Sequence, residues 1–171
     1  MKPSDELLDR ATTCCFTGHR CQKLPWRFKE NDLRCIKMKE STKAKIVTAI
    51  QNGYNTFISG MAIGFDMICA EIVLDLRRSY PIQLVCALPC KTQASKWSTA
   101  YKERYYNILK QADSIHCDRE FYTDTCMQER NEYMINHSSL VIALYNGLPG
   151  GTAKTLQYAK QQKCNIEIID V

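Results

Sequence analysis

Three short glycine-containing segments carry the residue types that bind phosphate groups. They are Thr17 to Arg20 (TGHR), Ser59 to Gly64 (SGMAIG) and Gly147 to Thr152 (GLPGGT). Glycine lets backbone amides approach an anion closely, and arginine and histidine side chains pair with phosphate oxygens. The last two segments run directly into predicted helices, whose first amides favour an anion. The candidate ligand-binding residues in these segments are Thr17, Gly18, His19, Arg20, Ser59, Gly60, Met61, Gly147, Gly150, Gly151 and Thr152.

These segments also have a purely structural interpretation. The turn from Thr17 to Arg20 could simply expose its basic side chains to water, and this reading carries about equal weight. Thr152 could serve as the N-cap of the helix that follows it, a role that does not exclude ligand binding. Two or three such turns at one edge of a sheet are less easily explained by structure alone, so an anion site is the prediction.

Two further polar residues, Arg130 and Asn131, lie beside the apolar stripe of a predicted helix. An arginine at the edge of such a stripe needs an anionic partner. That partner is either a bound ligand or a neighbouring carboxylate such as Asp124 or Glu129. Both residues therefore join the candidate ligand-binding set.

Asp66 and Glu71 are the candidate catalytic carboxylates, because either could activate a water molecule. Asp66 is also a candidate for reading sugar hydroxyls. Its structural interpretation is a favourable interaction with the dipole of the helix in whose first turn it lies. The catalytic residues, if the protein is an enzyme, remain open between these two.

Several chemistries find no support in the sequence. Neither the dinucleotide fingerprint G-x-G-x-x-G nor the P-loop G-x-x-x-x-G-K-[ST] occurs, so no nicotinamide or P-loop nucleotide cofactor is predicted. Cys86 and Cys90 lack a second pair at zinc spacing, so no metal site is predicted. The net charge of +5 favours an anionic small molecule, but it is too modest and too dispersed to indicate a nucleic-acid partner.

The elements that must position these residues alternate regularly along the chain. Apolar runs of strand length are followed by longer helical patterns, which predicts right-handed βαβ units and a mainly parallel sheet covered by helices on both faces. This is a doubly wound, Rossmann-like α/β fold, whose ligands bind beyond the carboxyl ends of the strands. Strands are expected at about 12–16, 55–58, 82–88, 114–117, 140–144 and 166–169, and helices at about 32–50, 63–76, 92–110, 125–136 and 152–162.

Composition indicates one domain over residues 1–171, with 45% hydrophobic and 24% charged residues. The segment from Met1 to Arg10 has no apolar region typical of a secretion signal, and no run is long enough to span a membrane, so a cytoplasmic protein is expected. The ten cysteines are then best read as reduced thiols that act as small hydrophobic core residues.

Taken in order, the motifs resemble those of a known family. CCFTGHR at Cys14 to Arg20, SGMAIGFDMICAE at Ser59 to Glu71, ERNEYM at Glu129 to Met134 and GLPGGTAKTLQYA at Gly147 to Ala159 are similar to the YpsA-like branch of the SLOG superfamily. That superfamily includes the LOG phosphoribohydrolases, the DNA-processing protein DprA and sensing domains of antiviral defence systems. The resemblance implies a Rossmann-like domain that binds a nucleotide or a nucleotide-derived ligand, commonly as a homodimer.

The resemblance to the LOG enzymes is incomplete at one position. Their glycine loop ends in a glutamate that supports cleavage of the base from ribose phosphate, and here Gln157 stands in its place. Glutamine cannot act as a general base, so a sensor or a sequestering protein for an ADP-ribose-like or cyclic nucleotide signal is favoured. A prophage-encoded sponge would suit a small single domain. A nucleotide hydrolase that uses Asp66 or Glu71 is the alternative, and single-stranded DNA binding as in DprA is a weaker one.

Overall fold

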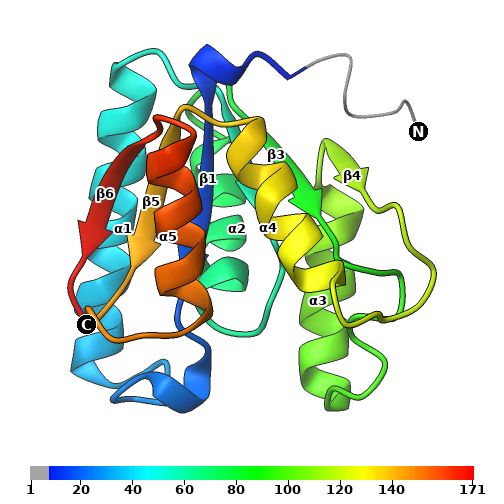
Figure 1. The fold of residues 1–171 in the computed structure, drawn as a ribbon. Helices are drawn as coiled ribbons and strands as arrows, with labels where there is room; N and C mark the ends of the chain where they lie inside the picture. The colour runs from blue at the N-terminus through cyan, green and yellow to red at the C-terminus, as the bar shows by residue number, and fades with distance from the viewer. Residues whose placement is uncertain (1–7) are drawn as a thin grey trace.

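The carboxyl ends of six parallel strands meet at one edge of a single sheet with the order β4-β3-β2-β1-β5-β6 (Figure 1). The computed structural model describes residues 8–171. The strands are β1 (Thr13–Gly18), β2 (Thr56–Ser59), β3 (Gln83–Ala87), β4 (Ser114–His116), β5 (Leu140–Leu144) and β6 (Asn165–Ile169). The helices are α1 (Leu33–Gln51), α2 (Phe65–Leu76), α3 (Thr99–Gln111), α4 (Cys126–Asn136) and α5 (Gly151–Gln161), with short 3-10 turns η2 (Arg10–Thr12) and η3 (Cys21–Lys23).

The helices form two layers, one on each face of the sheet. On one face α2 packs between α1 and α3, whereas α4 and α5 pack together on the other (Figure 1). The chain first builds outward from β1 to β4 and then crosses back to place β5 on the other side of β1. The predicted doubly wound α/β fold is therefore confirmed, with its switch in strand order between β1 and β5.

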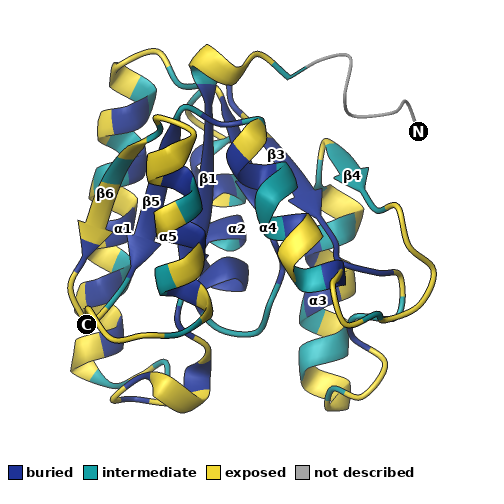
Figure 2. Cartoon of the chain, viewed as in Figure 1, coloured by how far each residue is buried: buried dark blue, intermediate teal, exposed yellow. Residues whose placement is uncertain are grey.

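The central strands are buried on both faces, which is why their sequences are continuously apolar instead of alternating (Figure 2). Cys14 and Phe16 pack into the larger core beneath α1, α2 and α3, whereas Cys15 between them packs into the smaller core beneath α4 and α5. The prediction that Cys69 and Cys86 also lie in the core is confirmed, because neither is exposed.

Most element boundaries lie within a residue or two of those expected, and two helix starts need correction. The helix expected from about Thr92 begins instead at Thr99, since the hydroxyl of Ser98 accepts a hydrogen bond from the amide of Tyr101 and caps it. Residues 91–97 form turns that line a surface hollow. Thr152 is not the N-cap of α5, because Gly150 holds that position.

The expected cap of α1 is confirmed: the Asp32 carboxylate accepts a hydrogen bond of 2.9 Å from the amide of Arg34. Among residues 8–171, no helix combines the length and the apolar character that a membrane span requires. Most of the segment examined for an export signal, residues 1–7, lies outside the described part of the chain.

Thiol accessibility tests this burial pattern. Eight cysteines are buried and only Cys117 and Cys164 are partly exposed. Burial also raises the pKa of Cys15 and Cys86 to about 12, which keeps those thiols protonated and unreactive. We expect a thiol-specific reagent at neutral pH to modify at most these two partly exposed positions in the native protein, and every cysteine after denaturation in urea. Rapid native labelling of any buried cysteine, located by peptide mass spectrometry, would contradict the arrangement.

Candidate functional site

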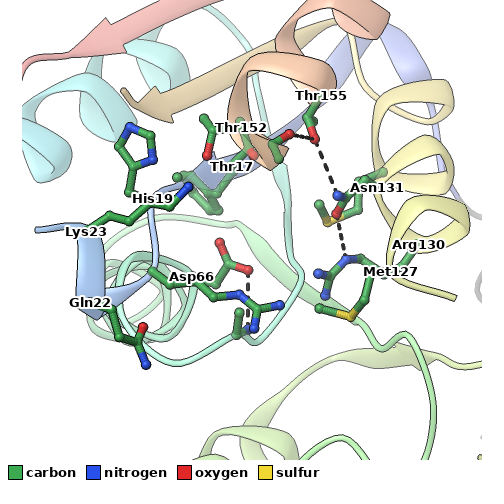
Figure 3. Close-up of a pocket in the computed structure, with 16 residues that line it drawn as sticks. Thr17, His19, Gln22, Lys23, Asp66, Met127, Arg130, Asn131, Thr152 and Thr155 are labelled. Atoms are coloured by element: carbon green, nitrogen blue, oxygen red, sulfur yellow. Dashed lines mark hydrogen bonds between the residues drawn. The ribbon is translucent and has the colours of Figure 1, made fainter. Parts of the chain in front are cut away.

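A cavity of about 300 Å³ opens beyond the carboxyl end of β1 (Figure 3). Its walls come from the loop after β1, the start of α2, one side of α4 and the start of α5. The helices α2, α4 and α5 all have their amino-terminal ends at this edge of the sheet, and none of these ends is capped by a side chain. Uncapped helix starts present free backbone amides, so the cavity lies in a positive field.

A buried pair of opposite charges, Asp66 and Arg130, lies in the cavity wall. Their residues are only 8% and 6% exposed. Burial raises the pKa of Asp66 and lowers the pKa of Arg130, while the attraction between the two groups opposes both shifts. Asp66 Oδ2 also accepts a hydrogen bond of 3.3 Å from the amide of Ala62. The two side chains come from α2 and α4, on opposite faces of the sheet, and both border the space beside Gly60 (Figure 3).

The sequence suggested Glu129 as a possible partner of Arg130, and this suggestion is wrong. Glu129 forms a two-point ion pair with Arg119 instead, at 2.7 and 2.8 Å. Helical geometry explains the difference, because Glu129 and Arg130 are adjacent residues and point to different sides of α4. Arg130 points inward and its guanidinium donates hydrogen bonds to the carbonyl of Gly60 and, over 2.8 Å, to Asn131 Oδ1.

The turn from Ser59 to Met61 shapes the cavity without lining it. Ser59 Oγ donates to the carbonyl of Asp66 over 2.8 Å and accepts a hydrogen bond from the amide of Met61. A β-carbon at Gly60 would lie 2.5 Å from Nη1 of Arg130 and 3.0 Å from Oδ2 of Asp66. A side chain at position 60 would therefore displace the buried charged groups of Arg130 and Asp66, which occupy the space of its β-carbon.

The end of β1 and the start of α5 supply hydroxyl groups to the cavity, and α5 also supplies amides. The hydroxyls of Thr17 and Thr152 are largely buried, and neither forms a hydrogen bond with any residue in the described range 8–171. Thr155 is already engaged, since its hydroxyl donates to the carbonyl of Gly151 and accepts from Asn131 Nδ2 at 3.3 Å. Two hydroxyls thus remain available to a ligand next to the uncapped helix start.

Basic side chains also border the cavity. The backbone of Arg20 pairs with Gly64 at the start of α2, which fixes the loop after β1 against that helix. Lys23 reaches over the start of α5, because a β-carbon on Gly150 would lie 3.0 Å from its Nζ. With Arg130, these three cations face the single carboxylate of Asp66 in the cavity lining.

His19 has a positioning role in the structure. Its Nε2 lies 2.8 Å from Oδ1 of Asn146 and 3.2 Å from the amide nitrogen of the same residue. Its own amide donates to the carbonyl of Leu144 at the end of β5. His19 therefore ties together the two loops that flank the switch in strand order.

The structure separates the predicted ligand-binding residues into two groups. Those that line the cavity are Thr17, Gly18, His19, Arg20, Asp66, Arg130, Asn131, Gly151 and Thr152. Those that lie behind or beside it are Ser59, Gly60, Met61, Gly147 and Gly150.

Glu71, the second candidate for activating water, does not reach the cavity. Its carboxylate pairs with Arg104, whose Nε lies 2.6 Å from Glu71 Oε1. Five residues advance a helix by about 1.4 turns, so Glu71 and Asp66 point to different sides of α2. The prediction that Glu71 could serve there is corrected on this ground.

Sequence reasoning assigned no ligand role to several residues that line the cavity. Thr155 follows Thr152 by three residues and Lys23 follows Arg20 by the same step, so helical spacing was an available signal for both. Gln22, which the turn η3 also brings to the cavity, had no comparable signal in the sequence. The remaining lining residues are Phe16, Ala62, Met127 and Met134.

Gln157, at the position of the LOG glutamate, lies outside the cavity. It lines a neighbouring hollow of about 650 Å³ between α4 and α5. This hollow shares the walls formed by Met127, Asn131, Gly151 and Thr155 with the cavity. Gln157 thus lines the neighbouring hollow, and the residues shared by the two hollows lie between it and the cavity that contains Asp66 and Arg130.

Comparison with known proteins gives consistent matches. A model of the YpsA family, described as the YspA SLOG family, matches residues 14–171. The uncharacterized SPbeta prophage-derived protein YoqJ of Bacillus subtilis is 35% identical over 141 residues, which cover 74% of this chain and 82% of that protein. A UPF0398 protein of Halalkalibacterium halodurans is 27% identical over 151 residues, which cover 86% of this chain and 79% of that one.

Two solved structures share the fold. The DNA processing protein A of Helicobacter pylori, described with a single-stranded DNA binding mode, superposes with a TM-score of 0.64 at 18% identity, covering 97% of this chain and 68% of that one. DprA of Streptococcus pneumoniae gives a TM-score of 0.61 at 14% identity, covering 91% of this chain and 50% of that one. At these identities the likeness extends to the fold alone.

The contrasting surroundings of two glycines generate a test of the site. Gly60→Ala pushes a methyl group against the buried guanidinium of Arg130, so we expect the free energy of unfolding to fall by about 1–3 kcal/mol. Gly151→Ala is the matched control, because a β-carbon there meets no atom within 4 Å and should change stability by less than about 0.5 kcal/mol. Urea denaturation followed by circular dichroism measures both. Equal stability of the two variants would show that Gly60 is not constrained by the charge pair.

Proposed function

The chain belongs to the YspA SLOG family, and from this premise we propose that it binds a nucleotide or nucleotide-derived ligand as a sensor or a sequestering protein. The observation that carries the proposal is the excess of unneutralised donors in the cavity. The uncapped amides of α5, the free hydroxyls of Thr17 and Thr152 and the cations of Arg20 and Lys23 face a space that contains one carboxylate. A phosphate group satisfies such donors better than water does.

The phosphate is proposed to lie over the start of α5. There the amides of Gly151 and Thr152 and the ammonium of Lys23 are close to one another. The small side of Gly151 leaves open space for an oxygen to approach the backbone. The exposed Arg20 then pairs with the side of the anion that faces solvent, and the buried Arg130 adds positive potential from the interior of the protein.

The sugar is proposed to lie against Asp66 and Asn131. Oδ2 of Asp66 accepts from Ala62, whereas Oδ1 forms no hydrogen bond with a described residue and can accept one from a ribose hydroxyl. The amide of Asn131 is held between Arg130 and Thr155, which fixes its orientation in the wall. Both side chains are thus already fixed, so they can hydrogen-bond to sugar hydroxyls with little further loss of conformational entropy.

Binding without turnover is favoured over hydrolysis. Gln157 replaces the LOG carboxylate and lies outside the cavity, and Glu71 is engaged with Arg104. A hydrolase remains the second candidate because Asp66 is a buried carboxylate whose pKa burial raises, as in many general bases. The sequestering role is also supported by the prophage-derived relative at 35% identity.

The direct experiment is calorimetry of the purified protein with AMP, ADP-ribose, NAD and cyclic dinucleotides, followed by chromatography of each mixture. Binding with quantitative recovery of intact ligand supports a sensor or sequestering protein, whereas free base or released phosphate supports the hydrolase. A single-stranded oligonucleotide completes the panel. Tight oligonucleotide binding with a steep salt dependence, and no mononucleotide binding, would favour the DprA-like alternative. Light scattering of the same sample measures the expected homodimer.

Removal of the two exposed cations tests the phosphate site. Arg20→Ala combined with Lys23→Ala should weaken AMP or ADP-ribose binding by about ten-fold or more, because charge-assisted hydrogen bonds to the phosphate are lost. The weakening should be largest at low salt, where these charges are least screened. Arg78→Ala is the matched control, since that side chain is 84% exposed at the far end of α2. Equal affinity of the double variant and the control would remove the phosphate from this rim.

Asp66→Asn separates the two candidate functions. If the protein only binds, affinity for the anionic ligand should be kept or should rise, because a negative charge leaves the cavity while the amide still accepts a hydrogen bond. If the protein is a hydrolase, product formation should fall by at least about a hundred-fold with little change in affinity. Thermal denaturation of the same variant checks that the fold survives the loss of the partner of Arg130. A variant that folds and yet loses all ligand binding would contradict the expectation that an amide can replace the carboxylate at this position.

A further inference from the structure

A second hollow, of about 530 Å³, adjoins the cavity on the side of the loop after β1. The two share the walls formed by Arg20, Gln22, Ala62 and Met127. A ligand held in the cavity can therefore continue into this hollow past the guanidinium of Arg20. Of the ligand-binding residues predicted from the sequence, only Arg20 lines this hollow.

Three aromatic side chains line this hollow, here called the aromatic hollow: Phe28, Trp97 and Tyr122. Each comes from a different connection, after β1, after β3 and after β4 respectively. Phe28 is 47% exposed and Tyr122 is 66% exposed, although both are large apolar side chains. Single exposed aromatics are common, but three that converge from separate segments on one hollow indicate a surface built for contact.

Two of these rings are held by neighbours and do not need to be ordered by a ligand. Trp97 packs edge to face against Tyr105, with ring centroids 5.2 Å apart, and Tyr105 is buried. Phe28 meets Tyr101 at 6.1 Å. An ordered aromatic wall loses little entropy when a flat ring stacks against it.

An ion-pair network also anchors the segment that carries Phe28. Glu30 receives hydrogen bonds from Arg104 and lies 2.8 Å from the ammonium of Lys39. Attraction to these two cations outweighs burial and lowers the pKa of Glu30, so the network is charged at neutral pH. The connection between β1 and α1 is thereby fixed against α3.

We propose that the aromatic hollow binds the base of the nucleotide whose phosphate occupies the cavity. This inference rests on the proposed function and adds the part of the ligand that the cavity alone does not recognise. Every nucleobase offers a π-face that stacks on aromatic side chains. The hydroxyls of Thr92 and Ser95 and the ammonium of Lys96 also line the hollow, and they can bind the polar edge of a base.

The test compares AMP with ribose 5-phosphate by calorimetry, because these ligands differ only in the base. The wild-type protein should bind AMP at least about ten-fold more tightly than ribose 5-phosphate, the advantage expected from stacking. Tyr122→Ala should remove most of that advantage and leave the affinity for ribose 5-phosphate unchanged. Phe121→Ala is the matched control, since the adjacent Phe121 is 69% exposed and does not line the hollow.

Tryptophan fluorescence gives an independent readout. The chain has two tryptophans, and Trp26 is only 4% exposed, away from the hollow. A stacked base should quench the emission of Trp97, and ribose 5-phosphate should not. Trp97→Phe should abolish this quenching while calorimetry still detects binding, because phenylalanine keeps an aromatic face.

The outcomes distinguish this inference from the function on which it rests. Equal affinities for AMP and ribose 5-phosphate, or an equal loss of both in Tyr122→Ala, would overturn the base site and leave phosphate binding in the cavity intact. Failure of both ligands to bind, in the wild-type protein and at millimolar concentration, would overturn the phosphate site and the base site together. A selective loss of AMP binding in Tyr122→Ala, absent in Phe121→Ala, supports the inference.

Discussion

The buried attraction between Asp66 and Arg130 is the interaction on which the site depends. Charges placed at this depth cost several kcal/mol each to desolvate, so neither is tolerated without the other, and removing one partner of such a pair costs about 3–5 kcal/mol. The attraction acts between α2 and α4, and the guanidinium of Arg130 donates its hydrogen bonds to the carbonyl of Gly60 and to Asn131 Oδ1. The requirement for glycine at position 60 and the bond from Ser59 to the backbone of Asp66 both follow from the need to house these charges.

The strand order then determines what can reach this pair. Because β5 returns to the other side of β1, the start of α5 lies beside the loop after β1, and both line the cavity together with α2 and α4. His19 holds the loops after β1 and β5 in register through Asn146, while α5 begins without a side-chain cap at the same edge. The attraction between two buried charges would not by itself require an uncapped helix start or hydroxyls without partners beside it. The free donors around it are what distinguish a ligand site from a purely structural one.

The glycine-rich segments illustrate how one residue type serves two physical purposes. Gly151 borders open space, where a backbone amide can meet an anion, whereas Gly60 is enclosed by two charged side chains. Both look the same in the sequence, because each precedes a helix after a buried strand. Only the atoms that surround the position of a β-carbon distinguish Gly151, which leaves room for a ligand, from Gly60, which makes room for two buried side chains.

The order and type of the elements, the parallel sheet and the buried cysteines were predictable from the sequence, because hydrophobic periodicity and turn residues act over a few neighbouring positions. The candidate phosphate turns were predictable for the same reason. The sequence could not decide that Asp66 enters the cavity while Glu71 leaves it, that Glu129 pairs with Arg119, or that Phe28, Trp97 and Tyr122 converge. These outcomes depend on how each helix is rotated against the sheet and on which strand ends become neighbours, and only the packing of the whole chain decides that.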